Sequence, residues 1–413
     1  MIKVSISTAF LSLLFIACNS YSNNQTVVST AADTTTMPPV ETRRPNSEYK
    51  PAFAGQTRIG GVTTRTPYTV NILTHSLKRP WGIGMLPDGR LLITEKVGVM
   101  RIVTLKGEVS EPITGLPEVN ASGQGGLLDV AIDPDFKNNR MLYWTFSERT
   151  PEGNLTAVAK GKLAADEKQV QDVTVVYRAT PAYNGNLHYG GRLLIDAAGN
   201  LVLSTGERSD LVTRPQAQML NSALGKIIRV TKEGKPAPGN PFIGKDNVRP
   251  ELYSYGHRNV QGLAFHPVTG DLWESEMGPK GGDEVNRIQP GHNYGWPVIG
   301  YGLEYSGQKV GEGITQKEGM EQPVYYWDPV LSPSGITFYS GDQIPEWKNN
   351  LFVAGLNSNH IARLVIVNNK VTGEERLLAG EGQRFRDVAE GKDGALYAIT
   401  DEGRLYRVAK KTE

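Results

Sequence analysis

The feature that most constrains the fold is a repeated pattern of two apolar-alternating segments joined by a turn containing Pro, Asp, Gly or Asn. It occurs six times, starting at Gly82, Leu128, Gly191, Gly262, Gly335 and Asp387. Alternation with a period of two on both sides of a turn predicts a β-hairpin at each place. The repeat therefore predicts an all-β protein in which helix is scarce.

A third alternating segment follows most of these hairpins, starting at Val99, Lys226, Ala362 and Arg404. One hairpin cannot bury both of its faces, whereas radial repetition of small antiparallel sheets buries them and protects their edges. We therefore predict a six-bladed β-propeller of four-stranded antiparallel blades over residues 66–413. The structural alternative is a pair of β-sandwiches, which is disfavoured because no linker divides the repeats at their midpoint.

The N-terminus has the pattern of an export signal. Residues 4–17 form a mostly apolar run after Lys3, and Cys18 follows directly. The run is shorter than the ~20 residues that span a bilayer but suits a signal peptide. A small residue before the cysteine resembles a bacterial lipoprotein signal, so we expect residues 1–17 to be removed and Cys18 to become the lipidated first residue of an exported, periplasmic or cell-surface protein. The alternative is an ordinary signal peptide with an incidental cysteine.

Residues 18–65 are rich in Ser, Thr, Asn and Pro and poor in aliphatic periodicity. Such a composition cannot bury enough apolar area to offset the entropy of ordering the chain. We predict a flexible tether between the leader and the propeller.

Charge and cysteine content exclude several classes of function. Lys and Arg number 44 against 43 Asp and Glu, a net charge of +1, which predicts no nucleic-acid partner and no electrostatic attraction to an anionic membrane. A single cysteine permits neither an intramolecular disulfide nor a thiolate zinc cluster. No segment has the spacing of a phosphate-binding loop, a dinucleotide fingerprint or a nucleophile elbow.

Two loops contain candidate catalytic groups. His188 lies among glycines in the loop 184–192, where an imidazole can take a proton near neutral pH. Arg258 and Asn259 stand at the entrance of a predicted strand, where they can present fixed donors to an anionic or carbonyl oxygen. Taken alone, each is also compatible with an ordinary packing or surface role.

Two further loops suggest ligand sites. Gly278 and Pro279 leave backbone carbonyls open beside acidic residues, a set of hard oxygen ligands that suits calcium, although a solvated acidic loop fits the bare pattern equally. Arg384 and Arg386 share one face of a strand, and two adjacent guanidinium groups repel unless an anion joins them. A polycarboxylate ligand is the functional interpretation and a solvated face is the alternative.

Taken together, the loop motifs resemble those of the soluble quinoprotein sugar dehydrogenases, the aldose sugar and glucose dehydrogenase family that uses pyrroloquinoline quinone (PQQ). The resemblance covers about 68–408 in matching order and rests on Gly-Gln-Gly-Gly-Leu-Leu from 123, His-Tyr-Gly-Gly-Arg from 188, Gly-His-Arg-Asn-Val-Gln-Gly from 256, Gly-Pro-Lys-Gly-Gly-Asp-Glu-Val-Asn from 278, Asn-Tyr-Gly-Trp-Pro from 293 and Arg-Phe-Arg-Asp from 384. The family fold is a six-bladed propeller, which agrees with the repeat count.

The resemblance implies PQQ- and calcium-dependent oxidation of an aldose at the anomeric carbon to the lactone, with hydride transfer to the quinone. His188 matches the general base, and Arg258 matches the group that stabilises charge on the quinone oxygen. The positions that match cofactor contacts are Gln124, His188, Arg258, Asn259, Asn357, Arg384 and Arg386. The carbonyls of Gly278 and Pro279 match ligands of the catalytic calcium, and Glu284 with the Tyr294 carbonyl resembles a second, structural calcium site.

Three residues depart from the family pattern. Asn357 stands where a cofactor-contacting lysine is common, Leu187 precedes the base where glucose enzymes have an aspartate, and Met277 replaces a polar residue. Alternative functions are therefore a cofactor-free propeller binding module and a calcium-dependent lactonase-type hydrolase. For the dehydrogenase, the expected partners are an aldose and an external electron acceptor, with a monomer or homodimer as the assembly. The loop 301–322 is the expected determinant of sugar choice.

Overall fold

The computed structural model describes residue 1 and residues 37–412. Residues 2–17 of the predicted signal peptide, Cys18 and residues 19–36 of the predicted tether fall outside these residues. Over 37–412 the regular elements are almost all strands, joined by long turns and loops, with one short α-helix, α1 (Phe136–Asn139), and three short 3-10 turns. In this part of the chain no helix is both long and apolar enough to cross a membrane.

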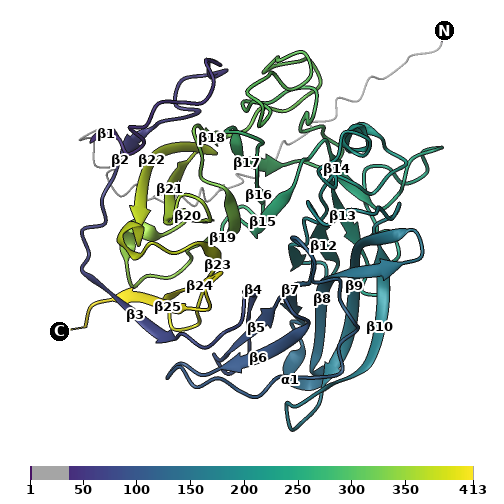
Figure 1. Ribbon diagram of the computed structural model, residues 1–413, viewed down its shortest axis with the longest axis vertical. Coiled ribbons are helices and arrows are strands. Elements are labelled where there is room, and N and C mark those ends of the chain that lie inside the picture. The colour runs from purple at the N-terminus through teal and green to yellow at the C-terminus, as the bar shows by residue number, and fades with distance from the viewer. Residues whose placement is uncertain (2–36, 413) are drawn as a thin grey trace. The chain divides into compact units, whose positions relative to one another are not determined.

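Six sheets are arranged around a common centre (Figure 1). The innermost strands of the six sheets are β4 (Pro80–Met85), β7 (Leu127–Ile132), β11 (Leu193–Ile195), β15 (Val260–Phe265), β19 (Pro333–Phe338) and β23 (Phe385–Glu390). Each of them lies beside the one that follows it in the chain. The last, β23, lies beside the first, β4, which closes the ring. Each pairs with the next strand of its predicted hairpin, respectively β5 (Leu91–Glu95), β8 (Met141–Thr150), β12 (Leu201–Ser204), β16 (Leu272–Glu276), β20 (Leu351–Gly355) and β24 (Leu396–Thr400). The predicted six-bladed β-propeller is confirmed.

The outer strands complete each blade. Three blades are regular four-stranded antiparallel sheets, finished by β9 (Gly153–Leu163) and β10 (Val170–Arg178), by β13 (Lys226–Val230) and β14 (Leu252–Tyr255), and by β17 (Asp283–Ile288) and β18 (Tyr325–Trp327). The first blade has three strands and ends at β6 (Val99–Val103).

The last blade joins the first strand of the propeller to the last strand of the chain. Its outer strand is β3 (Tyr68–Thr74), which pairs antiparallel with β25 (Leu405–Lys410). A strand from the start of the propeller thus completes a sheet built from its end. This pairing fastens the ring with backbone hydrogen bonds.

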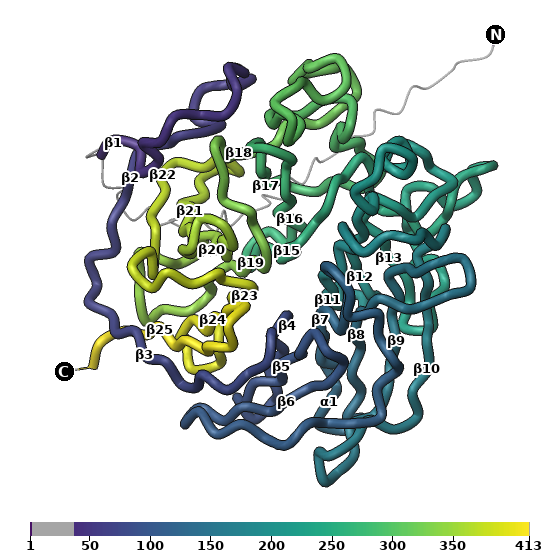
Figure 2. Tube along the Cα trace, viewed as in Figure 1, coloured from purple at the N-terminus to yellow at the C-terminus, as the bar shows by residue number. Residues whose placement is uncertain are grey.

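The fifth blade carries β19, β20, β21 (Ile361–Val367) and β22 (Lys370–Leu377), and two further strands extend it. These are β2 (Gly60–Gly61), parallel to β22, and β1 (Met37–Pro39), which pairs with β2. Figure 2 shows the segment from β1 to β2 alongside this blade. The structure thus differs from the tether expected up to residue 65.

Polar contacts explain why the segment before residue 65 is ordered. Asp328 accepts hydrogen bonds from the backbone N–H groups of Asn46 (2.7 Å) and Ser47 (3.0 Å) and from the Ser47 hydroxyl (2.9 Å). Glu41 is buried and pairs with Arg376 at 2.8 Å. The composition argument misses this order because it counts only apolar burial.

A buried ion-pair cluster ties the inner strands together at the centre. Arg192, at the end of the His188 loop, lies 2.9 Å from Asp387 and 3.4 Å from Asp129, and its Nε donates to the Gln261 carbonyl. Close packing here requires Gly335, because a Cβ at that position would lie 1.6 Å from Asp387 Oδ1. The cluster anchors the loop that carries His188.

Candidate active site

A cavity of about 450 Å³ gathers five of the predicted cofactor residues, namely Gln124, Asn259, Asn357, Arg384 and Arg386. They come from segments far apart in the chain: Arg386 lies in the inner strand β23, and the other four lie beside an inner strand or its hairpin partner. Tyr305, from the loop predicted to select the sugar, also lines this cavity. The sequence shows these residues only in separate motifs, and closure of the ring brings them to one cavity.

A second, smaller pocket gathers Arg258 and all four predicted metal-site residues, Gly278, Pro279, Glu284 and Tyr294. Met277 lines both pockets, so the two lie next to each other.

His188 is 5% exposed and lies behind the wall of the larger cavity, which its neighbours Tyr189 and Gly190 line. Its backbone has φ 46°. Its backbone N–H donates to Gln124 Oε1 at 2.8 Å, and its ring Nδ1 lies 2.7 Å from Glu207 Oε1. Over residues 37–412, Nε2 has no hydrogen-bond partner.

Glu207 was not identified from the sequence. It follows β12 in the run Ser-Thr-Gly-Glu, and nothing in that run distinguishes it from other strand ends. It is 1% exposed, and its backbone N–H donates to the Arg258 carbonyl. Only the packing of the two loops reveals it as the partner of His188.

Burial, together with the nearby positive charge of Arg258, lowers the pKa of His188 to about 4, although Glu207 opposes both effects. The imidazole is therefore neutral at pH 7. A neutral ring whose Nδ1 faces a carboxylate carries its proton there, which leaves Nε2 as the basic atom. Leu187, the residue before His188, is 43% exposed.

Arg258 turns toward the predicted metal ligands. Its Nη1 donates to the carbonyls of Met277 (3.0 Å) and Gly278 (2.8 Å), and its guanidinium lies 5.2 Å from the centre of the Trp296 ring. Its Nε is buried and has no hydrogen-bond partner among the described residues. The carbonyl of Gly278, expected to bind calcium, thus accepts a hydrogen bond from Arg258.

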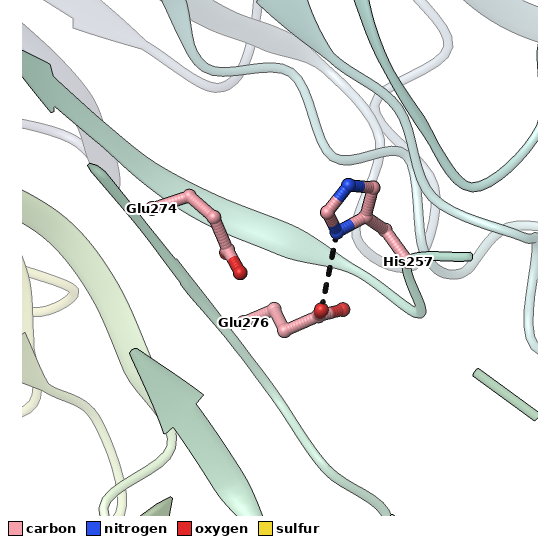
Figure 3. Close-up of side chains that lie close together, drawn as sticks. All are labelled: His257, Glu274 and Glu276. Carbon is pink, nitrogen blue, oxygen red and sulfur yellow. Dashed lines mark hydrogen bonds and ion pairs between the residues drawn. The ribbon is translucent and has the colours of Figure 1, made fainter. Parts of the chain in front are cut away.

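A buried acidic cluster borders the smaller pocket (Figure 3). One ligand atom from each of His257, Glu274 and Glu276 lies within 4.8 Å of the others. Glu276 lines the pocket together with Glu284, which faces it across β16 and β17. Asn286 donates to Glu274 Oε1 (2.7 Å) and Glu284 Oε2 (3.1 Å), while Glu274 Oε2 is buried without a described partner.

The charges of this cluster are poorly compensated. Burial, reinforced by the charge of Glu276, raises the pKa of both Glu274 and Glu284 well above the ordinary value. Buried carboxylates without a cation are costly, so the cluster favours protons or a bound cation.

The expected arginine pair is joined by a carboxylate of the protein. Nε of Arg384 and Nε of Arg386 each lie 2.9 Å from Asp401, and Arg384 also donates to Asn357 Oδ1 at 2.5 Å. An anion does join the two guanidinium groups, and in this structure it is Asp401 of the protein itself, so a polycarboxylate ligand at this place stays a prediction. Two other cations that the sequence analysis did not identify, Arg79 and Lys96, line the same cavity.

Comparison with known proteins identifies the family to which the chain is similar. Residues 77–407 match the family described as Glucose / Sorbosone dehydrogenase. The Aldose sugar dehydrogenase YliI of Escherichia coli (strain K12) is 41% identical over 352 residues, which cover 84% of this chain and 94% of that protein.

Solved structures of aldose sugar dehydrogenases are also similar to this chain. The apo-form of the soluble aldose sugar dehydrogenase from Escherichia coli has 40% identity and a TM-score of 0.80, covering 84% of this chain and 100% of that one. The PQQ-bound aldose sugar dehydrogenase from Streptomyces coelicolor has 31% identity and a TM-score of 0.69, covering 84% and 99%.

The fold and these matches define an oxidoreductase of the quinoprotein sugar dehydrogenase class. The chain belongs to the Glucose / Sorbosone dehydrogenase family.

Proposed function

We propose that this protein oxidises aldose sugars at the anomeric carbon to lactones, using PQQ and calcium. The observation that carries the proposal is the convergence of Gln124, Asn259, Asn357, Arg384 and Arg386 on one cavity, with His188 directly behind its wall. A related enzyme of Streptomyces coelicolor has been solved in a PQQ-bound form, which supports the same cofactor here.

The residues that line the larger cavity fit PQQ, a quinone that carries three carboxylates. Four cationic side chains line the cavity against one carboxylate, that of Asp401. The buried, unpartnered Nε of Arg258 next to it is a donor without an acceptor. Arg384 and Arg386 would hold carboxylates, and Gln124, Asn259 and Asn357 would supply neutral hydrogen bonds. When bound, PQQ supplies a two-electron acceptor.

His188 is the proposed general base. Glu207 holds its Nδ1–H, so Nε2 takes the proton of the anomeric hydroxyl while that carbon gives up its hydride. The lowered pKa keeps the ring unprotonated over the neutral range. Arg258 is the proposed donor to the oxygen on which negative charge develops.

Calcium is proposed at the smaller pocket. The carbonyls of Gly278 and Pro279 and the carboxylate of Glu284 with the carbonyl of Tyr294 are hard oxygen ligands that line it. The uncompensated charge of Glu274 and Glu284 supports a cation there. Arg258 occupies one lone pair of the Gly278 carbonyl, and the second lone pair would be the one offered to calcium.

Reconstitution tests the proposal. Purified protein supplied with calcium and PQQ should reduce an artificial electron acceptor when given aldoses, and chelation of calcium should stop the reaction. His188→Ala should abolish turnover while the exposed His75→Ala leaves it unchanged. A protein that binds no PQQ at micromolar cofactor is not a dehydrogenase of this type. Release of acid from lactones without PQQ would instead indicate the hydrolase.

A further inference from the structure

The larger cavity contains a cation that neither the motifs nor the family resemblance assigned. Lys96 follows β5, is 8% exposed, and lines the cavity together with Gln124, Arg384 and Arg386. Its Nζ donates to the carbonyl of Gly123 at 2.5 Å.

The charge of Lys96 is not paired with a carboxylate in the described part of the chain, whereas Asp401 partly compensates the charges of Arg384 and Arg386. Arg384 and Arg386 both pair with Asp401. An ammonium group has three N–H donors, and over residues 37–412 Nζ uses only the one bond to Gly123. Among these three cations, Lys96 is therefore the one that has no carboxylate partner among the described residues.

The lysine is also held in place. Its backbone N–H donates to the Arg79 carbonyl at 3.1 Å, and its own carbonyl accepts from Leu127 at 3.1 Å. Gly126, at φ 142°, lets the stem pass closely, because a Cβ there would lie 2.5 Å from Lys96 Cγ. A side chain fixed in this way loses little further freedom when it binds a ligand.

The surroundings favour an anion next to Nζ. Burial lowers the pKa of Lys96, as do the charges of Arg79 and Arg386, and only Asp401 opposes them. A half-buried cluster of like charges is costly until an opposite charge enters it.

We propose that Lys96 binds a carboxylate of PQQ and supplies the cationic contact that the neutral Asn357 does not. The inference rests on the proposed function and adds a cofactor-binding residue to it. Because the contact is an ion pair, it contributes to cofactor affinity and makes that affinity depend on salt.

Calorimetric titration of the calcium-loaded protein with PQQ, at low and high salt, tests the proposal without measuring turnover. Lys96→Met should weaken binding by about tenfold or more, as for a hydrogen bond to a charged group, and flatten its salt dependence. Lys96→Arg should recover most of the loss. Lys392→Met is a matched control, since Lys392 also donates to one backbone carbonyl, that of Pro87, but lies outside the cavity.

Lys96→Gln separates the ion pair from an anchoring role. The glutamine amide can still donate to the Gly123 carbonyl but carries no charge. If Lys96 only anchors the Gln124 loop, Lys96→Gln should bind PQQ as tightly as the unaltered protein. If Lys96 forms the ion pair, Lys96→Gln should bind PQQ as weakly as Lys96→Met. Unaltered affinity in Lys96→Met or Lys96→Gln, with thermal unfolding showing a folded protein, overturns the inference while leaving the dehydrogenase proposal standing. If the unaltered protein binds no PQQ, the dehydrogenase proposal itself fails.

Discussion

Nδ1 of His188 lies 2.7 Å from Oε1 of Glu207, and both side chains are buried. The carboxylate determines which ring nitrogen carries the proton and fixes the orientation of the ring. Glu207 is thus a positioning residue, acting on the substrate only through His188.

Glu207→Gln should lower kcat about tenfold to a hundredfold with little change in KM, because an amide can also donate to Nδ1 and so favours the wrong tautomer. Steady-state kinetics of the reconstituted enzyme measure this. Glu233→Gln, on an exposed carboxylate, is the control. Unchanged kcat in Glu207→Gln would show that Glu207 does not orient the base.

The acid limb of kcat/KM should lie near pH 4, well below the ordinary histidine pKa of about 6.5, because burial lowers the pKa of His188 to about 4. A pH–rate profile of folded enzyme tests this, and an acid limb near 6.5 would contradict it.

The lowered pKa of His188 also makes the stability of the folded protein depend on pH. Between pH 6.5 and 4, His188 is protonated in the unfolded chain but not in the folded protein. The free energy of unfolding should therefore fall as the pH falls through this window. Above pH 6.5, His188 should not affect it. His360, whose pKa burial also lowers to about 4, should add to the effect. His360→Gln should reduce the acid sensitivity of unfolding without moving the acid limb of kcat/KM.

Glu274→Gln should raise the melting temperature of the calcium-free protein at neutral pH, by about 1 kcal/mol or more in stability. Its amide oxygen can still accept from Asn286, while the uncompensated negative charge is removed. Because the folded pKa of Glu274 is raised, the gain should shrink toward acid pH, where the carboxyl is already protonated.

Thermal unfolding in chelator and in calcium measures the effect of Glu274→Gln. Calcium should reduce the gain, since a cation compensates the charge. A surface change, Glu233→Gln, should stay within about 0.5 kcal/mol. A lower melting temperature of Glu274→Gln in chelator would mean that the negative charge of Glu274 is compensated in the cation-free protein.

Asp328→Ala should destabilise the protein by about 1–3 kcal/mol and open residues 37–65 to proteases, because three hydrogen bonds to Asn46 and Ser47 are lost. Limited proteolysis and thermal unfolding detect this. Asp342→Ala removes an aspartate that is 82% exposed and should have almost no effect. Equal protease resistance in both variants would show that Asp328 does not fasten the segment.

The predictable part of the site was the part carried by motifs. Gly278, Arg258 and Arg386 lie in short runs distinctive enough to be recognised along the chain. Their partners Glu207 and Asp401 lie in strand ends and turns that resemble many others. Lys96 is similarly inconspicuous, since a lone lysine after a strand is ordinary.

The number of blades can be predicted from the chain alone, because alternation and turn residues are local properties that each hairpin displays on its own. The folded protein is needed to show that β3 closes the last blade, that residues 37–65 extend the fifth blade, and that Glu207 meets His188. These contacts form between segments that only ring closure brings together. Their energies come from hydrogen bonds and charges whose partners are distant in the chain.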